Sequence, residues 1–383
     1  RRRGSEVTMA TSRSFSLLSL LCLSSYSLGC CFVSNLHFPR EIGQPRAAAN
    51  GVCRRTCFSS PTALAGGFGN NLGKQSKGSS KGGKSAKPPK QDKAQVAKPS
   101  PSMEYAMKEA SKIVDNLNED EDPFWQLIEP LILSEFPRSE MERVIGFIEY
   151  STNKRSLPPS IVDDKWRPHE EIHAFMDGIP ASPFRDTSAF PFIAELEANY
   201  EKIKAEFEAL LEKESDRFQS VTSMNYKSGW KTLVLYYNGH GIDGFPYHLC
   251  PVTKSILDKV PVAGRIAGFN RQSPQSGIPL HSDGNNMWLT CQMGIKVPAG
   301  QKAWIRVGPE TRRWAPGKCL LYDTTFEHET FNESPDEERV VLHVDFWNFA
   351  DLTPMEVRAM QRIYQLREMY LQAEGLLEVG GKL

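Results

Sequence analysis

Acidic residues are almost absent from the first hundred residues of this 383-residue chain. That segment carries only Glu6, Glu41 and Asp92, against 16 lysines and arginines. Because the whole chain holds 46 basic and 46 acidic residues, the remainder carries 30 bases and 43 acids. A body with excess negative charge lacks the clustered cations that nucleic-acid binding requires. The sequence therefore indicates a basic leader joined to an acidic body that does not bind nucleic acid.

Cysteine is scarce in the body, where only Cys250, Cys291 and Cys319 occur. Three widely spaced cysteines provide neither a disulfide framework nor a paired C-x-x-C zinc site. Glycine and proline, at 28 and 26 residues, are close to ordinary usage, which excludes a fibrous chain. The chain shows no internal repeat. Its length and composition are those of one or two globular domains preceded by the basic leader.

Residues 1–33 are predicted to be a signal-peptide-like segment that starts at Met9. Arg13 precedes an apolar run from Phe15 to Val33, which ends in small residues, as secretory signal peptides do. The alternative is a retained transmembrane anchor, and we expect contact with a membrane only in that case. The leader therefore predicts entry into the secretory route.

Residues 34–101 are rich in arginine, lysine, serine and glycine, a composition that does not bury a core and predicts disorder. A signal peptide followed by such a segment, with Phe32 near the expected cleavage point, resembles the bipartite plastid presequences of algae with secondary plastids. The resemblance implies a plastid location if the source is an alga. The alternative is an ordinary secretory signal with a flexible linker, which would place the body in the ER lumen.

The body is predicted to divide into a helical region at 102–218, a β-rich domain at 219–352 and a C-terminal helix at 353–383. Apolar residues recur at three- and four-residue spacing in 105–118, 124–136, 140–150, 192–213 and 355–377, and the pattern over 192–213 predicts one long amphipathic helix. Six short apolar segments follow the period of strands: 230–237, 265–272, 288–297, 303–307, 318–322 and 339–347. The expected fold is mainly β, a barrel or double-sheet jelly roll with helices packed around it.

One motif that could bind a metal is His169-Glu170-Glu171-Ile172-His173. Two histidines four residues apart share one face of a helix and form the H-E-x-x-H pattern of zinc peptidases. Here Pro168 immediately precedes the motif, Gly178 closes the segment, and no third ligand follows clearly. The alternative interpretation, a short exposed helix or loop without a metal, is therefore favoured.

A second motif places His281 and Asp283 two residues apart, with His328 further along the β-rich half. Residues two apart on a strand point to the same face, so the first pair is predicted to reach one ion. Two histidines and one carboxylate are the ligands of non-haem Fe(II) oxygenases, and their metal-facing atoms should converge within about 3–4 Å. The competing interpretation is that His281 and Asp283 are turn residues of a polar loop.

Arg339 opens an apolar strand in which Val341 and His343 would point the same way. Arg339 would then lie inside the barrel, where a buried guanidinium needs an anionic partner, and a dicarboxylate co-substrate would supply one through a two-pronged contact. The alternating positions Val340, Leu342, Val344 and Phe346 are expected to pack between the sheet and the outer helices.

The chain from about Gly229 to Met360 resembles the aspartyl/asparaginyl β-hydroxylase family of Fe(II)/2-oxoglutarate-dependent dioxygenases. The resemblance lies in the segments GWKTLVLYY, GIPLHSDGNN, MGIKVPAGQKAWIRVGPETRRWAPGKCLLYDTTFEHETF and ERVVLHVDFWNFADLTP. The helical segment PFIAELEANYEKIKAEFEALL also resembles one that precedes the core in many relatives. The resemblance implies a double-stranded β-helix of the cupin-like jelly-roll type, with Fe(II), 2-oxoglutarate and O2 as cofactor and co-substrates.

The same resemblance implies roles for individual residues. His281 and His328 fall on the two histidine ligands of the family, and Arg339 on the arginine that binds the distal carboxylate of 2-oxoglutarate. Asp283, where animal peptide hydroxylases have glycine, completes a triad like that of bacterial lipid A hydroxylases. Thr290 and Gln292 stand where many relatives carry an arginine and a histidine that help hold the co-substrate. No catalytic side chain beyond these ligands is expected.

Three functions follow from these patterns. The first is a dioxygenase that hydroxylates an Asp/Asn or related side chain of a protein, or a lipid or small molecule. The second is a cupin-like binding module without turnover, which the uncharged residues Thr290 and Gln292 favour. The third is a zinc peptidase that uses His169 and His173.

Overall fold

The computed structural model describes Lys108, 112–113, 122–158, 164–167, 174–219, 228–283 and 285–374. The predicted leader at 1–101, the histidine pair His169 and His173, and most of the predicted helix at 105–118 fall outside these residues. Among the residues that it does describe, no helix is long and apolar enough to cross a membrane.

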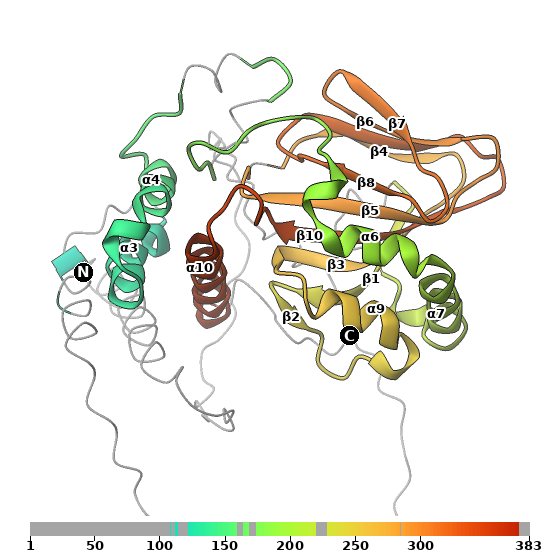
Figure 1. Ribbon diagram of the computed structural model, residues 1–383, viewed down its shortest axis with the longest axis horizontal. Coiled ribbons are helices and arrows are strands. Elements are labelled where there is room, and N and C mark those ends of the chain that lie inside the picture. The colour runs from blue at the N-terminus through green and yellow to red at the C-terminus, as the bar shows by residue number, and fades with distance from the viewer. Residues whose placement is uncertain are drawn as a thin grey trace, which may run out of the picture.

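Three helices form a lobe beside the β-structure (Figure 1): α3 (Pro123–Glu135), α4 (Glu142–Ser151) and α10 (Pro354–Ala373). Their apolar faces share one core with residues at the ends of β5 and β10, including Trp288 and Trp347. Helix α10 begins in a capping box in which Thr353 and Glu356 satisfy each other's free backbone N–H groups. Glu356 also accepts from Arg143 of α4, so that the start of α10 is fixed to its neighbour.

Two antiparallel sheets make up the β-structure. The larger has the order β2 (His240–Gly241), β1 (Trp230–Tyr237), β3 (Val262–Gln272), β10 (Arg339–Trp347), β5 (Trp288–Lys296) and β8 (Cys319–Tyr322). The smaller has the order β4 (Ser276–His281), β9 (His328–Asn332), β6 (Ala303–Val307) and β7 (Glu310–Arg313). This pair of sheets, with non-consecutive strands as neighbours, confirms the predicted double-stranded β-helix core packed by helices.

Helices α6 (Pro191–Ala198), α7 (Tyr200–Lys213) and α9 (Pro251–Leu257) cover the outer face of the larger sheet (Figure 1). The prediction of one continuous helix over 192–213 was wrong, because the chain breaks at Asn199. The side-chain amide of Asn199 donates to the Glu195 carbonyl 2.9 Å away, and its own backbone leaves helical geometry. Asparagine is a poor helix former because its side chain bonds to nearby backbone in this way.

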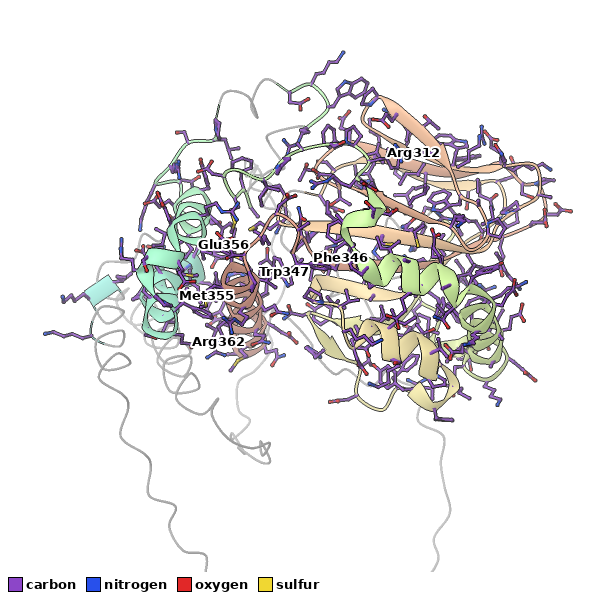
Figure 2. All side chains as sticks on the ribbon, viewed as in Figure 1. Arg312, Phe346, Trp347, Met355, Glu356 and Arg362 are labelled. Carbon is purple, nitrogen blue, oxygen red and sulfur yellow. The ribbon has the colours of Figure 1, made fainter. Side chains whose placement is uncertain are left out.

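Strand β10 lies near the centre of the larger sheet, and its two faces differ. Val340, Leu342, Val344 and Phe346 pack with the three outer helices, as predicted, and Figure 2 shows Phe346 beside α6. Burying each such side chain contributes roughly 1.5–3 kcal/mol. Val341 points the other way, into a core shared with β6 of the smaller sheet. Its neighbours on that inner face, residues 339, 343 and 345, are polar and buried or nearly so.

The remaining short helices are single turns: Arg138–Glu140, Thr187–Ala189, Ser215–Arg217 and Tyr247–Leu249. The C-terminal helix predicted over 355–377 is described as α10 up to Ala373. It packs against α3 and α4 and against β3, so it joins the helical lobe to the larger sheet. This arrangement leaves the inner faces of the two sheets to hold the polar side chains.

Candidate metal centre

The two histidines of the predicted triad face each other across neighbouring strands of the smaller sheet. His281 ends β4, His328 begins β9, and the antiparallel register pairs them directly. Their ring centroids are 4.2 Å apart. A register irregularity between Ile278 and His281 shifts the end of β4 relative to β9. Strand pairing therefore brings together two side chains that are 47 positions apart in the sequence.

Both imidazole rings are held in the same tautomer. The Nδ1 atom of His281 lies 2.8 Å from the Pro279 carbonyl, and Nδ1 of His328 lies 2.8 Å from the Phe326 carbonyl. A carbonyl only accepts, so each Nδ1 carries a proton, and in the neutral form of the ring Nε2 then keeps its lone pair. Fixing a histidine through its other ring nitrogen is the usual way in which proteins orient a metal ligand.

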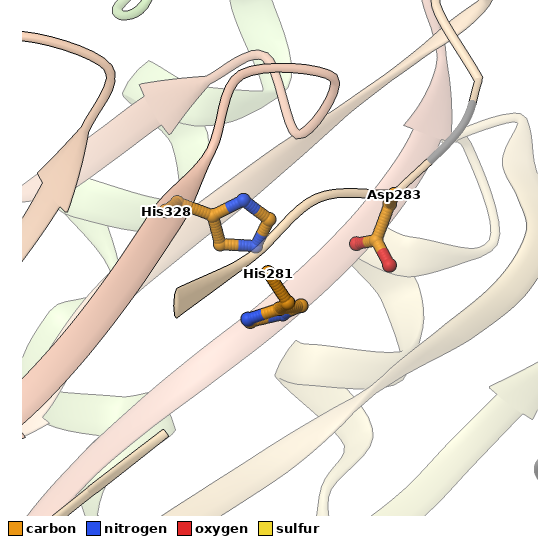
Figure 3. A group of neighbouring side chains, drawn as sticks. All are labelled: His281, Asp283 and His328. Carbon is orange, nitrogen blue, oxygen red and sulfur yellow. The ribbon is translucent and has the colours of Figure 1, made fainter. Parts of the chain in front are cut away.

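Asp283 completes the group from a loop rather than from a strand. The prediction placed His281 and Asp283 on the same face of one strand. That reason was wrong, because strand β4 ends at His281. Instead the backbone N–H of Asp283 donates to the Thr324 carbonyl, 2.8 Å away, and this bond turns the carboxylate toward the histidines (Figure 3). Ligand atoms of His281, Asp283 and His328 lie within 4.8 Å of one another, the one such group among the described residues.

This spacing suits a single ion. Ligand atoms about 2.1 Å from one ion lie at most about 4.2 Å apart, so small side-chain shifts bring the three atoms to the required distance. Two imidazoles and one carboxylate on one side of an ion would leave its other positions open for co-substrate and oxygen, as in non-haem Fe(II) oxygenases. The structure thus brings the three residues together, while their role as iron ligands stays a prediction.

The electrostatics of the group favour the protonation states that a metal requires. Burial disfavours the charge on Asp283, but Arg265 and the two histidines outweigh it and hold its pKa at about 2. Burial, reinforced by the neighbouring His281, lowers the pKa of His328 to about 3. The carboxylate is therefore ionised and His328 is neutral near pH 7, so neither must lose a proton when a cation binds.

Arg339 lies inside the β-structure, as predicted. It is 0% exposed, and its guanidinium carbon lies 4.1 Å from the ring centre of Trp314 and 4.6 Å from that of Trp230. Burial lowers the pKa of Arg339 to about 9. Among the described residues no side chain or carbonyl accepts a hydrogen bond from its Nε, Nη1 or Nη2. A buried cation with three unused donors requires an anion that the described chain does not provide.

Other unused polar atoms lie on the same inner face. Gln272 stands opposite Arg339 in the β3–β10 register, and its Oε1 has no partner in the described structure, nor has Oε1 of Gln292. An anionic co-substrate with polar oxygens, together with water, would satisfy such groups. The residues around Arg339 therefore fit 2-oxoglutarate.

Tyr322 connects the two ends of the site. Its ring centroid is 6.1 Å from that of His328. Burial and then Asp345 raise its pKa well above the ordinary value, and the charges of both Arg339 and Asp283 act on the same hydroxyl. The candidate metal-ligating group and the buried arginine thus both lie near this one side chain.

The predicted co-substrate residues Thr290 and Gln292 have other partners in the structure. Thr290 donates to Oδ1 of Asp345 at 2.5 Å, and Gln292 donates to Nδ1 of His343 at 2.9 Å. Their roles in binding 2-oxoglutarate remain predictions. His343 lies on the inner face as expected, and its Nε2 is 3.0 Å from Asp345 rather than against the triad.

Sequence reasoning missed two charged residues of the site. Arg265 on β3 contacts Asp283 through Nη1, and its Nε lies 3.4 Å from Oδ2 of Asp345. Asp345 is 0% exposed in the middle of an apolar strand. A carboxylate at such a position needs charged or hydrogen-bonding partners, so the residue itself was a usable signal. The identity of its partner, Arg265, depends on the register in which β3 pairs with β10.

Together the two sheets form a double-stranded β-helix, and its inner side carries the two-histidine and one-carboxylate group and an arginine that has no hydrogen-bond partner among the described residues. A comparison with protein families agrees: residues 197–348 match the model described as aspartyl/asparaginyl β-hydroxylase. The resemblance noted in the sequence is thereby confirmed for residues 197–348.

Two curated relatives illustrate the range of the family. The chain is 34% identical over 172 residues to an ornithine lipid ester-linked acyl 2-hydroxylase of Rhizobium tropici, covering 43% of this chain and 60% of that protein. It is 29% identical over 192 residues to the human aspartate beta-hydroxylase domain-containing protein 2, covering 45% and 49% respectively. The matches thus span about half to three fifths of the relatives' lengths.

Among solved structures, a prolyl-4-hydroxylase from Pseudomonas putida overlaps 41% of this chain and 98% of its own. Its sequence identity is 11% and the TM-score is 0.27, a value too low to support a conclusion about fold or function.

Proposed function

We propose that this protein is an Fe(II)/2-oxoglutarate-dependent hydroxylase of the aspartyl/asparaginyl β-hydroxylase type. The observation that carries the proposal is the pairing, within one site, of the group His281, Asp283 and His328 with a buried Arg339 that has no anionic partner among the described residues. The match of residues 197–348 to the family model supports it. When bound, iron with 2-oxoglutarate and O2 supplies the redox chemistry that hydroxylates a C–H bond and releases succinate and carbon dioxide.

The protein's own residues position and shield the reactants. His281, Asp283 and His328 would hold the iron through two Nε2 atoms and one carboxylate oxygen. Arg339 would clamp the distal carboxylate of 2-oxoglutarate, with Trp230 and Trp314 stacked on its guanidinium to exclude water and fix its plane. These rigid strand positions hold the co-substrate before the reaction, so little order has to be gained during it.

The proposed substrate is a C–H bond in a protein Asp/Asn side chain, or in a lipid or small molecule. The names of the relatives support both, since one acts on an ornithine lipid acyl chain and others are aspartate β-hydroxylase-type proteins. We propose further that the chain enters the secretory route. Its final location would be a plastid if the source is an alga, and otherwise the ER lumen.

The test is release of succinate from 2-oxoglutarate by the iron-loaded protein. Peptides rich in Asp and Asn and lipid vesicles would be supplied in parallel, with His328→Ala as the matched inactive control. Succinate release that requires His328 supports the proposal, and stimulation by one substrate class identifies it. Metal binding without succinate release from any substrate would instead support the cupin-like binding module, which the internal bonds of Thr290 and Gln292 favour.

A further inference from the structure

Arg265 bridges two carboxylates that belong to different parts of the fold. Through Nη1 it contacts Oδ2 of Asp283, in the loop after β4 of the smaller sheet. Through Nε it approaches Oδ2 of Asp345, on β10 of the larger sheet, at 3.4 Å. Arg265 itself lies on β3 of the larger sheet. One guanidinium therefore connects the predicted carboxylate ligand to the central strands across the two sheets.

The second carboxylate is a rigid support. Asp345 is fully buried and accepts from Thr290 at 2.5 Å, while His343 lies 3.0 Å from its other oxygen. Gln292 in turn donates to His343, so β5 and β10 hold the carboxylate from both sides. A guanidinium has a planar, fixed set of donors. Anchoring one edge of Arg265 on Asp345 therefore fixes the direction of the edge that meets Asp283.

The contact leaves one oxygen of Asp283 free. Arg265 uses Oδ2, and a carboxylate has a second oxygen with lone pairs of its own. A metal ion bound by the histidines can take that oxygen while Arg265 keeps the first. The arrangement would hold Asp283 as a ligand through one oxygen and stop it from rotating toward solvent, to which its side chain is 24% exposed.

A role for Arg265 in binding an anionic substrate is less well supported. Its side chain is 35% exposed, but two carboxylates already surround it and neutralise its charge. Arg339, by contrast, has no acidic partner among the described residues. The charge balance therefore distinguishes the two arginines. Arg339 is available to bind an anion, whereas Arg265 binds carboxylates of the chain itself.

We infer that Arg265 is a positioning residue of the metal centre: it orients Asp283 for coordination by anchoring it to Asp345. The inference rests on the proposed metal centre and deepens it. Outer-shell partners of this kind typically contribute about 10- to 100-fold to metal affinity. We expect the same contribution of Arg265 to metal affinity. It would act by orienting Asp283 and not by binding the co-substrate.

The experiment titrates Co(II) into the full metal-free chain and records the affinity and the visible absorption of the bound ion. Arg265→Gln removes the bridge, Arg265→Lys keeps a charge without the planar fork, and Arg271→Gln is the matched control. Arg271 lies on the same strand and pairs with Glu338 at 2.7 Å, away from the triad. We expect about 10- to 100-fold weaker binding and an altered spectrum for Arg265→Gln, an intermediate loss for Arg265→Lys, and wild-type behaviour for Arg271→Gln.

Two results for Arg265→Gln would overturn the inference. The first is wild-type affinity for Co(II) with an unchanged spectrum. The second is tighter binding, which would show that Arg265 competes with the ion for Asp283. If thermal unfolding shows that Arg265→Gln does not fold, Arg265→Lys decides: weaker Co(II) binding supports the inference and unchanged binding refutes it. Failure of the wild type to bind Co(II) would instead remove the proposed metal centre itself.

Discussion

His281 and His328 are direct cross-strand partners, with ring centroids 4.2 Å apart at the meeting point of β4 and β9. Backbone carbonyls two residues before each histidine fix both rings in the same tautomer. The pair is therefore set by strand register and does not depend on a flexible loop. The third candidate ligand, Asp283, does come from a loop, which makes its contribution separable by mutation.

Asp283→Asn is expected to weaken metal binding more than loss of an outer partner does. The amide keeps the shape of the carboxylate but removes the charge that balances the cation, so we expect a loss beyond about 100-fold. Two histidines would still bind weakly, and His328→Ala should abolish specific binding. Calorimetric titration with Co(II) measures both. Equal affinity in Asp283→Asn and the wild type would refute a ligand role for Asp283.

Arg339→Lys is expected to impair 2-oxoglutarate binding while sparing the metal. Lysine keeps a charge but loses the two-pronged contact and the stacking between Trp230 and Trp314. Losing a charge-assisted pair in a closed site costs roughly 2–4 kcal/mol, or about 30- to 1000-fold in affinity. A 2-oxoglutarate titration of metal-loaded protein tests this, with metal content checked in both samples. An unchanged co-substrate constant would remove Arg339 from the site.

Thr290→Val is expected to destabilise the protein through Asp345. The substitution preserves volume but removes the donor that lies 2.5 Å from a fully buried carboxylate. Leaving such a group short of a hydrogen bond costs about 1–3 kcal/mol. Thr311→Val on the exposed strand β7 is the control and should change the free energy of unfolding by less than about 0.5 kcal/mol. Urea unfolding measures both, and equal midpoints would show that the contact contributes nothing.

His169→Ala combined with His173→Ala is expected to leave turnover and metal content nearly unchanged. The motivation is the sequence alone: the motif is short, follows Pro168 directly and lacks a clear third ligand. Elemental analysis of the purified double variant, beside the wild type, checks the expectation. A loss of bound zinc from the variant would revive the peptidase interpretation.

His240 should contribute stability that disappears as pH rises. Its Nε2 lies 3.2 Å from Glu368 of α10, and this hydrogen bond raises its pKa above the ordinary 6.5 against the effect of burial. A raised pKa in the folded state means that the contribution is complete below pH 6.5 and is lost as pH rises through the folded value. His240→Gln should therefore lower the unfolding midpoint at pH 5.5 more than at pH 8.5. Half-exposed pairs contribute only about 0.2–1 kcal/mol, so the difference should be a few degrees at most. Equal effects at both pH values would contradict it.

The strands that sequence periodicity predicted are the long apolar ones. All six predicted strands closely overlap observed strands, namely β1, β3, β5, β6, β8 and β10, because these strands bury apolar side chains. The strands β4, β7 and β9 carry proline, charged or polar residues and offered no apolar period. Strands β4 and β7 are the two edges of the smaller sheet, and edge strands are often polar because this protects them against pairing with other chains.

Only part of the site could be predicted from the sequence. His281, Asp283, His328 and Arg339 could be found from spacing, strand position and family resemblance. The contact between Arg265 and Asp283 could not, because it depends on where the loop after β4 returns over β3. The placement of Asp283 on a strand was wrong because His281 ends the strand, and a backbone bond to Thr324 turns the side chain inward instead.

The two halves of the site stand on different sheets. The candidate metal-ligating histidines belong to the four-stranded sheet and Arg339 to the six-stranded sheet, with Val341 and Ile305 in the apolar layer between. If the histidines hold iron as proposed, the distance from that ion to Arg339 depends on the separation of the two sheets, which the packing of the interior determines. A co-substrate of fixed length would therefore bind most tightly at one particular separation of the two sheets. Trimming a methyl group from the interlayer core would change how tightly the dicarboxylate is held while iron affinity stays constant.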